Sequence, residues 1–141
     1  MSTSMPLYAG DVSVGTVIPE VVRIPSYVQL FRFSAATSNA HRIHFDQKYA
    51  EQEGYPDVLV QSHLHGSLLA QTVIDWAGPG ARLRKFRWQN RQLATPQDEL
   101  RYTGTVTSVD GALIECTLEE TNQLGELCAP AWATVELPTR E

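Results

Sequence analysis

All four histidines of the chain, His41, His44, His63 and His65, lie in the single stretch from Phe33 to Ala70. An imidazole exchanges protons at neutral pH because its unperturbed pKa is near ~6.5. In the same stretch a polar segment without any period, residues 37–43, is followed by a long apolar helical pattern. This is therefore the part of the chain where residue types and spacing predict acid–base chemistry.

The histidines and cysteines do not have metal-ligand spacing. His63 and His65 are two positions apart on a predicted helix and do not face each other. Cys116 and Cys128 form no Cys-x-x-Cys motif, so we expect two free thiols and no metal site. The sequence also lacks a Gly-x-Ser-x-Gly motif, a phosphate-binding glycine loop and a dinucleotide fingerprint, so we expect no cofactor.

A first helix is predicted over about residues 27–36. Ser26 stands just before the helical pattern and is a preferred N-cap residue. Tyr27, Leu30 and Phe31 recur at helical spacing, so they are expected to face the core. Residues 37–43 are then expected to form a loop.

Two further helices follow this loop. A short one, Gln47–Gln52, is predicted between Asp46 as N-cap and Gly54 in the left-handed C′ position. A long one, Ser62–Asp75, is predicted with Ser62 as its cap. Its side chains leave little polar surface, so we expect this helix to be buried on most sides.

The second half of the chain has the alternation of strands. An Asp110-Gly111 hairpin separates two of them, and Pro130 is expected at a bend or an edge. A short strand over Val12–Val17 and a β-rich run at residues 21–24 are expected earlier. The later strands are predicted at Arg82–Gln92, Leu100–Val109, Leu113–Thr121 and Leu127–Leu137. About five antiparallel strands and one long apolar helix indicate an α+β domain, a sheet wrapped around that helix.

The whole chain, residues 1–141, is predicted to be a single domain, with residues 1–11 frayed. A single sheet leaves an edge and part of the helix uncovered, so a dimer is expected. The net charge of −5 argues against nucleic-acid binding. No apolar run approaches the ~20 residues of a membrane span, and no signal peptide is recognisable, so we expect a cytoplasmic protein that does not bind membranes.

Positive charge is concentrated on one predicted strand. The cluster is a solvated edge strand in one interpretation and a landing site for phosphate groups in the other. Its members are Arg82, Arg84, Lys85 and Arg87.

The run Asn39-Ala40-His41-Arg42-Ile43-His44, followed by Phe45-Asp46, resembles the MaoC-like hydratase/dehydratase family. It is most similar to the type 2 hydroxyacyl-thioester dehydratases and mesaconyl-CoA-like hydratases, and Gly54-Tyr55-Pro56 fits the same branch. Val73–Pro79 resembles the small subunit of heteromeric hydratases that act on steroid side-chain enoyl-CoA thioesters. The resemblance covers about residues 20–137 and implies the hotdog fold.

The resemblance also implies residue roles in hydration of an enoyl thioester. His44 stands at the position of the general acid/base. Asn39 stands where the family has a catalytic aspartate, and its amide would hold and orient the water. The backbone N–H groups of Ser62 and His63 would form the oxyanion hole at the start of the long helix. His63 and His65 side chains are expected in or at the rim of the pocket.

Arg42, Gly66, Arg84 and Arg87 are candidate substrate-binding residues. Arg84 and Arg87 would meet the phosphates of coenzyme A, and Arg42 would meet a phosphate, pair with Asp46, or be solvated. Gly66 has an alternative role, which is to let the long helix pack closely against a neighbour.

The leading hypothesis is a 2-enoyl-CoA hydratase or (R)-3-hydroxyacyl-CoA dehydratase, a hydro-lyase whose coenzyme A is part of the acyl-CoA substrate. Because Asn39 cannot take up a proton, an alternative is a non-catalytic or half-site acyl-CoA-binding subunit of a hetero-oligomeric hydratase. The partner would be a second copy in a homodimer, or another hotdog chain in a heterodimer or heterotetramer. A hotdog thioesterase is disfavoured, because the loop carries His44 where that reaction needs a carboxylate.

Overall fold

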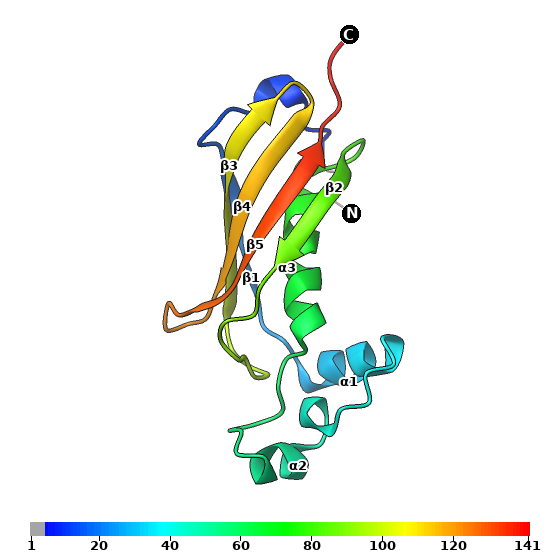
Figure 1. Cartoon of the computed structure of the whole chain (residues 1–141), viewed down its shortest axis with the longest axis vertical. Helices are drawn as coiled ribbons and strands as arrows, with labels where there is room; N and C mark the ends of the chain where they lie inside the picture. The colour runs from blue at the N-terminus through cyan, green and yellow to red at the C-terminus, as the bar shows by residue number, and fades with distance from the viewer. Residues whose placement is uncertain (1–4) are drawn as a thin grey trace.

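The computed structural model describes residues 5–141 and shows a five-stranded antiparallel sheet that curves around one long helix, α3 (Figure 1). The strand order is β1-β3-β4-β5-β2, as expected for an α+β sheet around a helix. The elements are η1 (Ala9–Asp11), β1 (Val17–Arg23), α1 (Tyr27–Ala36), η2 (Arg42–His44), α2 (Gln47–Gln52), α3 (Ser62–Ala77), β2 (Arg82–Trp88), β3 (Leu100–Asp110), β4 (Leu113–Thr121) and β5 (Leu127–Glu136).

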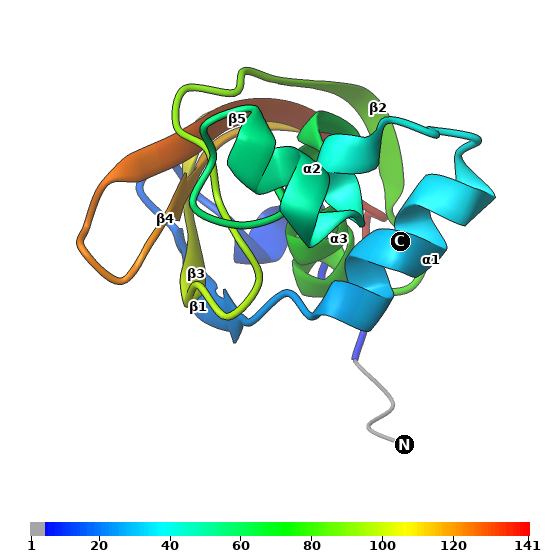
Figure 2. The same ribbon diagram turned by 90° about the horizontal axis from the view of Figure 1, so that it is seen from below.

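The two shorter α-helices lie beyond one end of the sheet, at the N-terminal end of α3 (Figures 1 and 2). Their predicted bounds and caps are confirmed. The Ser26 hydroxyl accepts a hydrogen bond from the Gln29 amide, and the Asp46 carboxylate accepts one from the Tyr49 amide, each at 3.1 Å. Gly54 has a φ of 91°, as its position after α2 requires. The polar loop of residues 37–43 runs into η2, a single 3₁₀ turn that ends at His44.

The core lies between α3 and the concave face of the sheet. Leu69 and Val73 of α3 are fully buried, as are Leu100 and Ile114 of the sheet. The opposite side of α3 is open, and Ile74 there is 45% exposed, so the expectation of burial on most sides is wrong. The reason is geometric, since one curved sheet covers only one side of a helix.

The start of α3 differs from the prediction by one residue. Ser62 is the first helical residue, and the N-cap is Gln61, whose side chain does not cap the helix. The buried Gln61 amide instead donates to the Leu30 carbonyl at 2.7 Å and to the Ser34 hydroxyl at 2.9 Å. These bonds fix the start of α3 against α1.

Three other expectations at the N-terminal side are wrong. No strand covers Val12–Val17, because β1 begins at Val17. Tyr27 and Phe31 are 44% and 61% exposed, and only Leu30 of the three faces the core. Residues 9–11 are held in place, since the Ala9 amide donates to the Pro138 carbonyl at 2.9 Å. The part of the frayed-terminus prediction that concerns residues 1–4 lies outside the described residues.

The later strands form at the predicted places, with shifts at their ends, and β3, β4 and β5 pair in chain order. β2 pairs with β5 and not with β3, the next strand in the chain. β2 ends at Trp88 rather than Gln92, and the two loop residues of the β3–β4 hairpin are Gly111 and Ala112. Pro130 is not on an edge strand, because β5 lies between β4 and β2. It lies one residue beyond the last β2 pair, Trp88↔Ala131, where β5 has a single strand partner and a missing N–H is tolerated.

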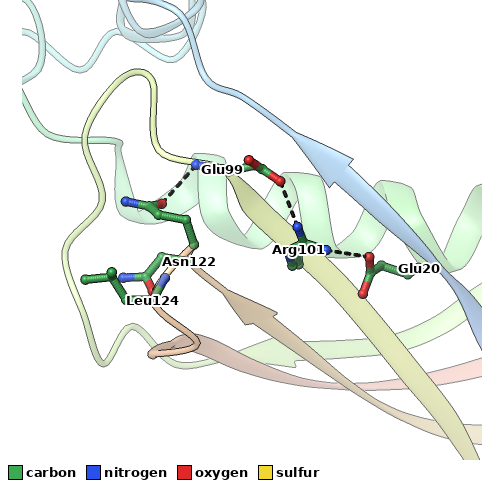
Figure 3. Close-up of polar contacts among 6 residues, drawn as sticks. Glu20, Glu99, Arg101, Asn122 and Leu124 are labelled. Atoms are coloured by element: carbon green, nitrogen blue, oxygen red, sulfur yellow. Dashed lines mark hydrogen bonds and ion pairs between the residues drawn. The ribbon is translucent and has the colours of Figure 1, made fainter.

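Surface ion pairs join the outer strand to its neighbour. Arg101 of β3 donates to Glu20 of β1 at 2.9 Å and to Glu99 at 2.8 Å, as Figure 3 shows. The turn between β4 and β5 is held by Asn122, whose side-chain oxygen accepts from the amides of Leu124 and Glu126 at 2.9 and 3.0 Å. These contacts stabilise the sheet, and their residues are distant in sequence from the four histidines.

Both cysteines are buried free thiols, as predicted. Burial raises the pKa of the Cys116 thiol to about 11 and that of the Cys128 thiol to about 12. Within residues 5–141 there is no cluster of metal-binding side chains. In the same part of the chain, no helix is long and apolar enough to cross a membrane.

Candidate active site

A hollow of about 360 Å³ at the N-terminal end of α3 brings together residues from three separate segments. His44 comes from η2, Ser62 and His65 come from α3, and a loop after β2 closes the other side. The lining residues are His44, Leu59, Val60, Ser62, His65, Asn90, Arg91, Gln92 and Leu93. Two of the four histidines therefore share one hollow with the start of the long helix.

His44 is nearly buried, at 9% exposed, and its ring has a defined orientation. Its Nδ1 lies 2.7 Å from the Leu59 carbonyl oxygen. A carbonyl can only accept, so Nδ1 carries the proton and Nε2 has a free lone pair when the ring is neutral. Burial lowers the pKa of His44, with a smaller lowering by His41 and an opposing contribution from the bond to Leu59. His44 is therefore neutral at pH 7 and suited to accept a proton at Nε2.

Backbone contacts hold this arrangement in place. The Leu59 amide donates to the Ile43 carbonyl at 2.8 Å, so the carbonyl that orients His44 is itself tied to η2. The Val60 amide donates to the Ala94 carbonyl at 2.9 Å and connects the same segment to the loop after β2. Backbone hydrogen bonds between three segments of the chain therefore fix the position of the His44 imidazole.

The first turn of α3 presents free amides, as predicted. The N–H groups of Leu64 and His65 bond to the Gln61 carbonyl. Those of Ser62 and His63 have no acceptor among residues 5–141. Free N–H groups and the positive end of the helix dipole favour an oxygen that gains negative charge. Ser62 lines the hollow of His44, so the amides and the imidazole belong to one site.

Asn39 lies in a different hollow. That hollow, of about 370 Å³, is mostly apolar and includes Phe31 and Phe45. The Asn39 side-chain oxygen accepts from the His41 amide at 3.2 Å. The structure does not bring Asn39 and His44 into one hollow of the chain, and the role of Asn39 in holding water stays a prediction.

The four predicted substrate-binding residues do not line the hollow of His44 either. Arg42 pairs with Asp46 at 2.7 Å and lies over the Tyr49 ring. Arg84 pairs with Glu136, and Arg87 lies over the Trp132 ring at 4.2 Å. Gly66 packs against Trp88 so closely that an added Cβ would lie 2.5 Å from the indole, which favours its alternative packing role. The cation at the hollow is Arg91.

Sequence reasoning missed a buried pair, His65 with Glu120. His65 is 2% exposed and Glu120 is 0% exposed, and the Nδ1 of His65 contacts the Glu120 carboxylate. The signal was present in β4, where Ile114, Cys116 and Leu118 alternate toward the core and Glu120 continues the same phase. A carboxylate in an apolar phase needs a partner, because burying an unpaired charge is costly.

In a comparison with protein families, residues 16–96 match the model described as hydroxyacyl-thioester dehydratase type 2. This span includes His44, Ser62 and His65. The chain belongs to this family. The predicted MaoC-like resemblance is therefore confirmed, and the assignment makes this family member a hydro-lyase.

Among known relatives, the family member is similar to the β subunit of 3-oxo-4,17-pregnadiene-20-carboxyl-CoA hydratase from Mycobacterium tuberculosis. The two are 30% identical over 131 residues, which is 91% of this chain and 97% of that subunit. A chain of the ChsH1-ChsH2 complex, from the same organism, is 26% identical with a TM-score of 0.83, covering 89% of this chain and 98% of that one.

The fold is also shared with more distant proteins. The (R)-hydratase PhaJ1 from Pseudomonas aeruginosa superimposes with a TM-score of 0.90 at 18% identity, over 96% of this chain and 88% of that one. The sheet wrapped around α3 is thus the hotdog fold that the sequence resemblance implied.

Proposed function

We propose that this dehydratase-family chain catalyses the reversible addition of water to a 2-enoyl-CoA, with His44 as the general acid/base. The observation that carries the proposal is the orientation of His44. Its Nδ1–H donates to the Leu59 carbonyl, which leaves Nε2 as the proton acceptor, and His44 lines the same hollow as Ser62 at the start of α3. A base and an oxyanion site are the two elements that this reaction needs most.

The chemistry follows from these positions. A water held by His44 Nε2 attacks Cβ of the enoyl thioester and gives its proton to the imidazole. Charge moves to the thioester oxygen, which accepts hydrogen bonds from the Ser62 and His63 amides. Cα then takes up a proton, so that the H and OH of one water have been added across the double bond and the (R)-3-hydroxyacyl product is complete. The reverse sequence is the dehydration. No redox or metal step is needed, so coenzyme A enters only as part of the substrate.

A second candidate function is that of one subunit in a hetero-oligomeric hydratase. Asn39 replaces the expected carboxylate, and the relative from Mycobacterium tuberculosis is itself named as a β subunit. Exposed apolar side chains also lie on α1 and on the open side of α3, namely Val28, Phe31 and Ile74. Such a surface suits another hotdog chain, which would supply the missing carboxylate while this chain binds acyl-CoA.

The test uses the purified chain alone. Its mass in solution is measured by light scattering, and hydration of crotonyl-, octenoyl- and steroid side-chain enoyl-CoA is followed by loss of the conjugated-thioester absorbance. An active homodimer supports the first function and excludes the second. A chain that binds acyl-CoA without turnover, and gains activity only when co-purified with another hotdog chain, supports the second. A chain that neither binds nor hydrates any of the three refutes both.

A further inference from the structure

We propose that His65 and Glu120 form a second acid–base unit of this site, in which His65 exchanges the Cα proton of the substrate and Glu120 positions His65. The inference rests on the proposed hydratase function. It assigns the step that His44 leaves open, the delivery of a proton to Cα after water has added to Cβ.

The two ring nitrogens of His65 have different surroundings. Its Nδ1 contacts the Glu120 carboxylate, inside the core between α3 and β4. Its other ring nitrogen, Nε2, has no hydrogen-bond partner among residues 5–141, and the residue lines the same hollow as His44 and Ser62. One nitrogen is thus anchored in the core while the ring borders the place where a substrate would lie.

The Glu120 carboxylate has two effects on the His65 ring. A buried carboxylate that accepts the Nδ1 proton orients the imidazole and stabilises the imidazolium that forms when Nε2 is protonated. His44 has only a neutral carbonyl in the equivalent place. The two histidines of one hollow therefore differ in the partner of Nδ1, which is a carboxylate for His65 and a carbonyl for His44, and this difference suits them to separate roles.

A purely structural role does not explain why His65 and Glu120 are buried together. Glu120 is fully buried on β4, and the His65 ring that contacts its carboxylate is itself 2% exposed. The buried Tyr102 hydroxyl of β3 lies beside the same carboxylate. A buried ion pair contributes little stability compared with apolar side chains of the same size.

The C–O bond forms between water and Cβ, and the water proton goes to His44 Nε2. The enolate collapses to the thioester as Cα takes the proton from His65 Nε2, which leaves His65 neutral. His44 then releases its proton to solvent and His65 takes one up, so both return to their starting forms. The net reaction adds H and OH across one C=C bond.

Other charged and titratable groups surround the pair. Tyr102 comes from β3, Cys128 from β5 and Arg23 from β1, and His44 and Arg91 line the hollow itself. Burial first, and then the charge of Glu120, raises the pKa of the Tyr102 hydroxyl, so it stays neutral through the range in which a histidine titrates. Burial likewise keeps the Cys128 thiol neutral. Within residues 5–141, Glu120 is therefore the negative group in contact with His65.

The test compares wild type with Glu120→Gln and His65→Asn. Thr72→Val serves as control, since Thr72 is equally buried on α3 but its hydroxyl bonds only within the helix, to the Leu68 carbonyl. The readouts are kcat, the pH profile of kcat/KM, and the ¹⁵N shifts of the His65 ring as a function of pH. Circular dichroism establishes that each variant is folded.

His65→Asn should lower kcat by about 10²–10⁴-fold, the usual contribution of a general acid. Glu120→Gln should lower kcat by at least ~10-fold and move the high-pH limb of the profile to lower pH, with the low-pH limb of His44 unchanged. Thr72→Val should leave both limbs in place. If Glu120→Gln does not fold, the wild-type ¹⁵N shifts decide, because a His65 that donates the Cα proton must carry a proton on both ring nitrogens within the pH range of activity.

An active wild type with an unchanged high-pH limb in folded Glu120→Gln, or with a His65 ring that stays neutral from pH 5 to 9, overturns this inference and leaves the proposed function standing. A wild type that hydrates no enoyl thioester, alone or with a partner chain, overturns the proposed function itself.

Discussion

Replacing His44 by asparagine separates its chemistry from its structural bond. The asparagine amide nitrogen takes the place of Nδ1 and can still donate to the Leu59 carbonyl, which now lies 2.7 Å from the ring. The variant loses Nε2, so it keeps the local fold and has no base. His44→Ala removes both the base and the bond.

The expected changes in kcat and in folding stability follow from the loss of the base and the loss of the bond. A positioned general base contributes about 10²–10⁴ in rate, or about 3–5 kcal/mol of barrier, so both variants should lose that much in kcat. His44→Ala also leaves the buried Leu59 carbonyl without a donor, which costs about 1–3 kcal/mol of folding stability. His44→Asn should therefore match His44→Ala in activity while being clearly more stable.

The lowered pKa of His44 predicts the direction in which stability and activity change with pH. The pKa of His44 is lowered in the folded state, so the unfolded chain binds the proton more readily. The stability contribution of neutral His44 is complete above the unfolded value of about 6.5. It is lost as the pH falls from there through the folded pKa. Activity should fall in the same direction, on a low-pH limb that begins below ~6.5.

The assay is hydration of an enoyl-CoA at several pH values, with thermal unfolding of the same samples. Wild type should lose Tm between pH 7 and pH 5 more steeply than His44→Asn, which has no group to titrate there. An active wild type together with a His44→Asn variant of near-normal kcat would refute the role of His44 as base. Equal stability of the two variants would refute the importance of the bond to Leu59.

Two further predictions concern residues named from the sequence. Asn39→Asp should raise kcat if the site has lost its carboxylate and lower it if the site is built for the amide. An unchanged rate would show that Asn39 lies outside the reacting centre, and Asn39→Ser provides the uncharged control. Gly66→Ala should destabilise the fold by about 1–3 kcal/mol in urea unfolding, because its Cβ would lie 2.5 Å from the Trp88 ring. A stable Gly66→Ala variant with a raised KM would instead support contact of Gly66 with substrate.

Local signals in the sequence were sufficient for the elements that hold the site. Ser26 and Asp46 cap their helices through their own side chains, a contact that spans three residues and can be recognised from spacing alone. The alternation of β4 and β5 likewise predicts their ends to within a residue. His44 was found for a different reason, namely its resemblance to a family motif, since nothing in the local pattern distinguishes it from His41.

The errors arise where a contact joins distant parts of the chain. Ser62 looked like a helix cap, but the cap position belongs to Gln61, whose amide is occupied by Leu30 and Ser34 of α1. Tyr27 and Phe31 have the helical spacing of a buried face, yet only Leu30 of the three reaches the core. Periodicity predicts that a helix has an apolar face and cannot tell whether that face meets its own sheet or another surface.

The buried polar residues show how the fold and the site depend on each other. Gln61 has a structural explanation, because it donates two hydrogen bonds that tie the first turn of α3 to α1. Ser62 and His63 follow it directly, so the position of their free amides depends on how α1 packs. The exposed apolar side chains of α1, Val28 and Phe31, lie on that same helix. Any displacement of α1 therefore acts on the residue that precedes the two amides, and the geometry proposed to stabilise the thioester oxygen is fixed partly by a helix that lies outside the sheet and its core.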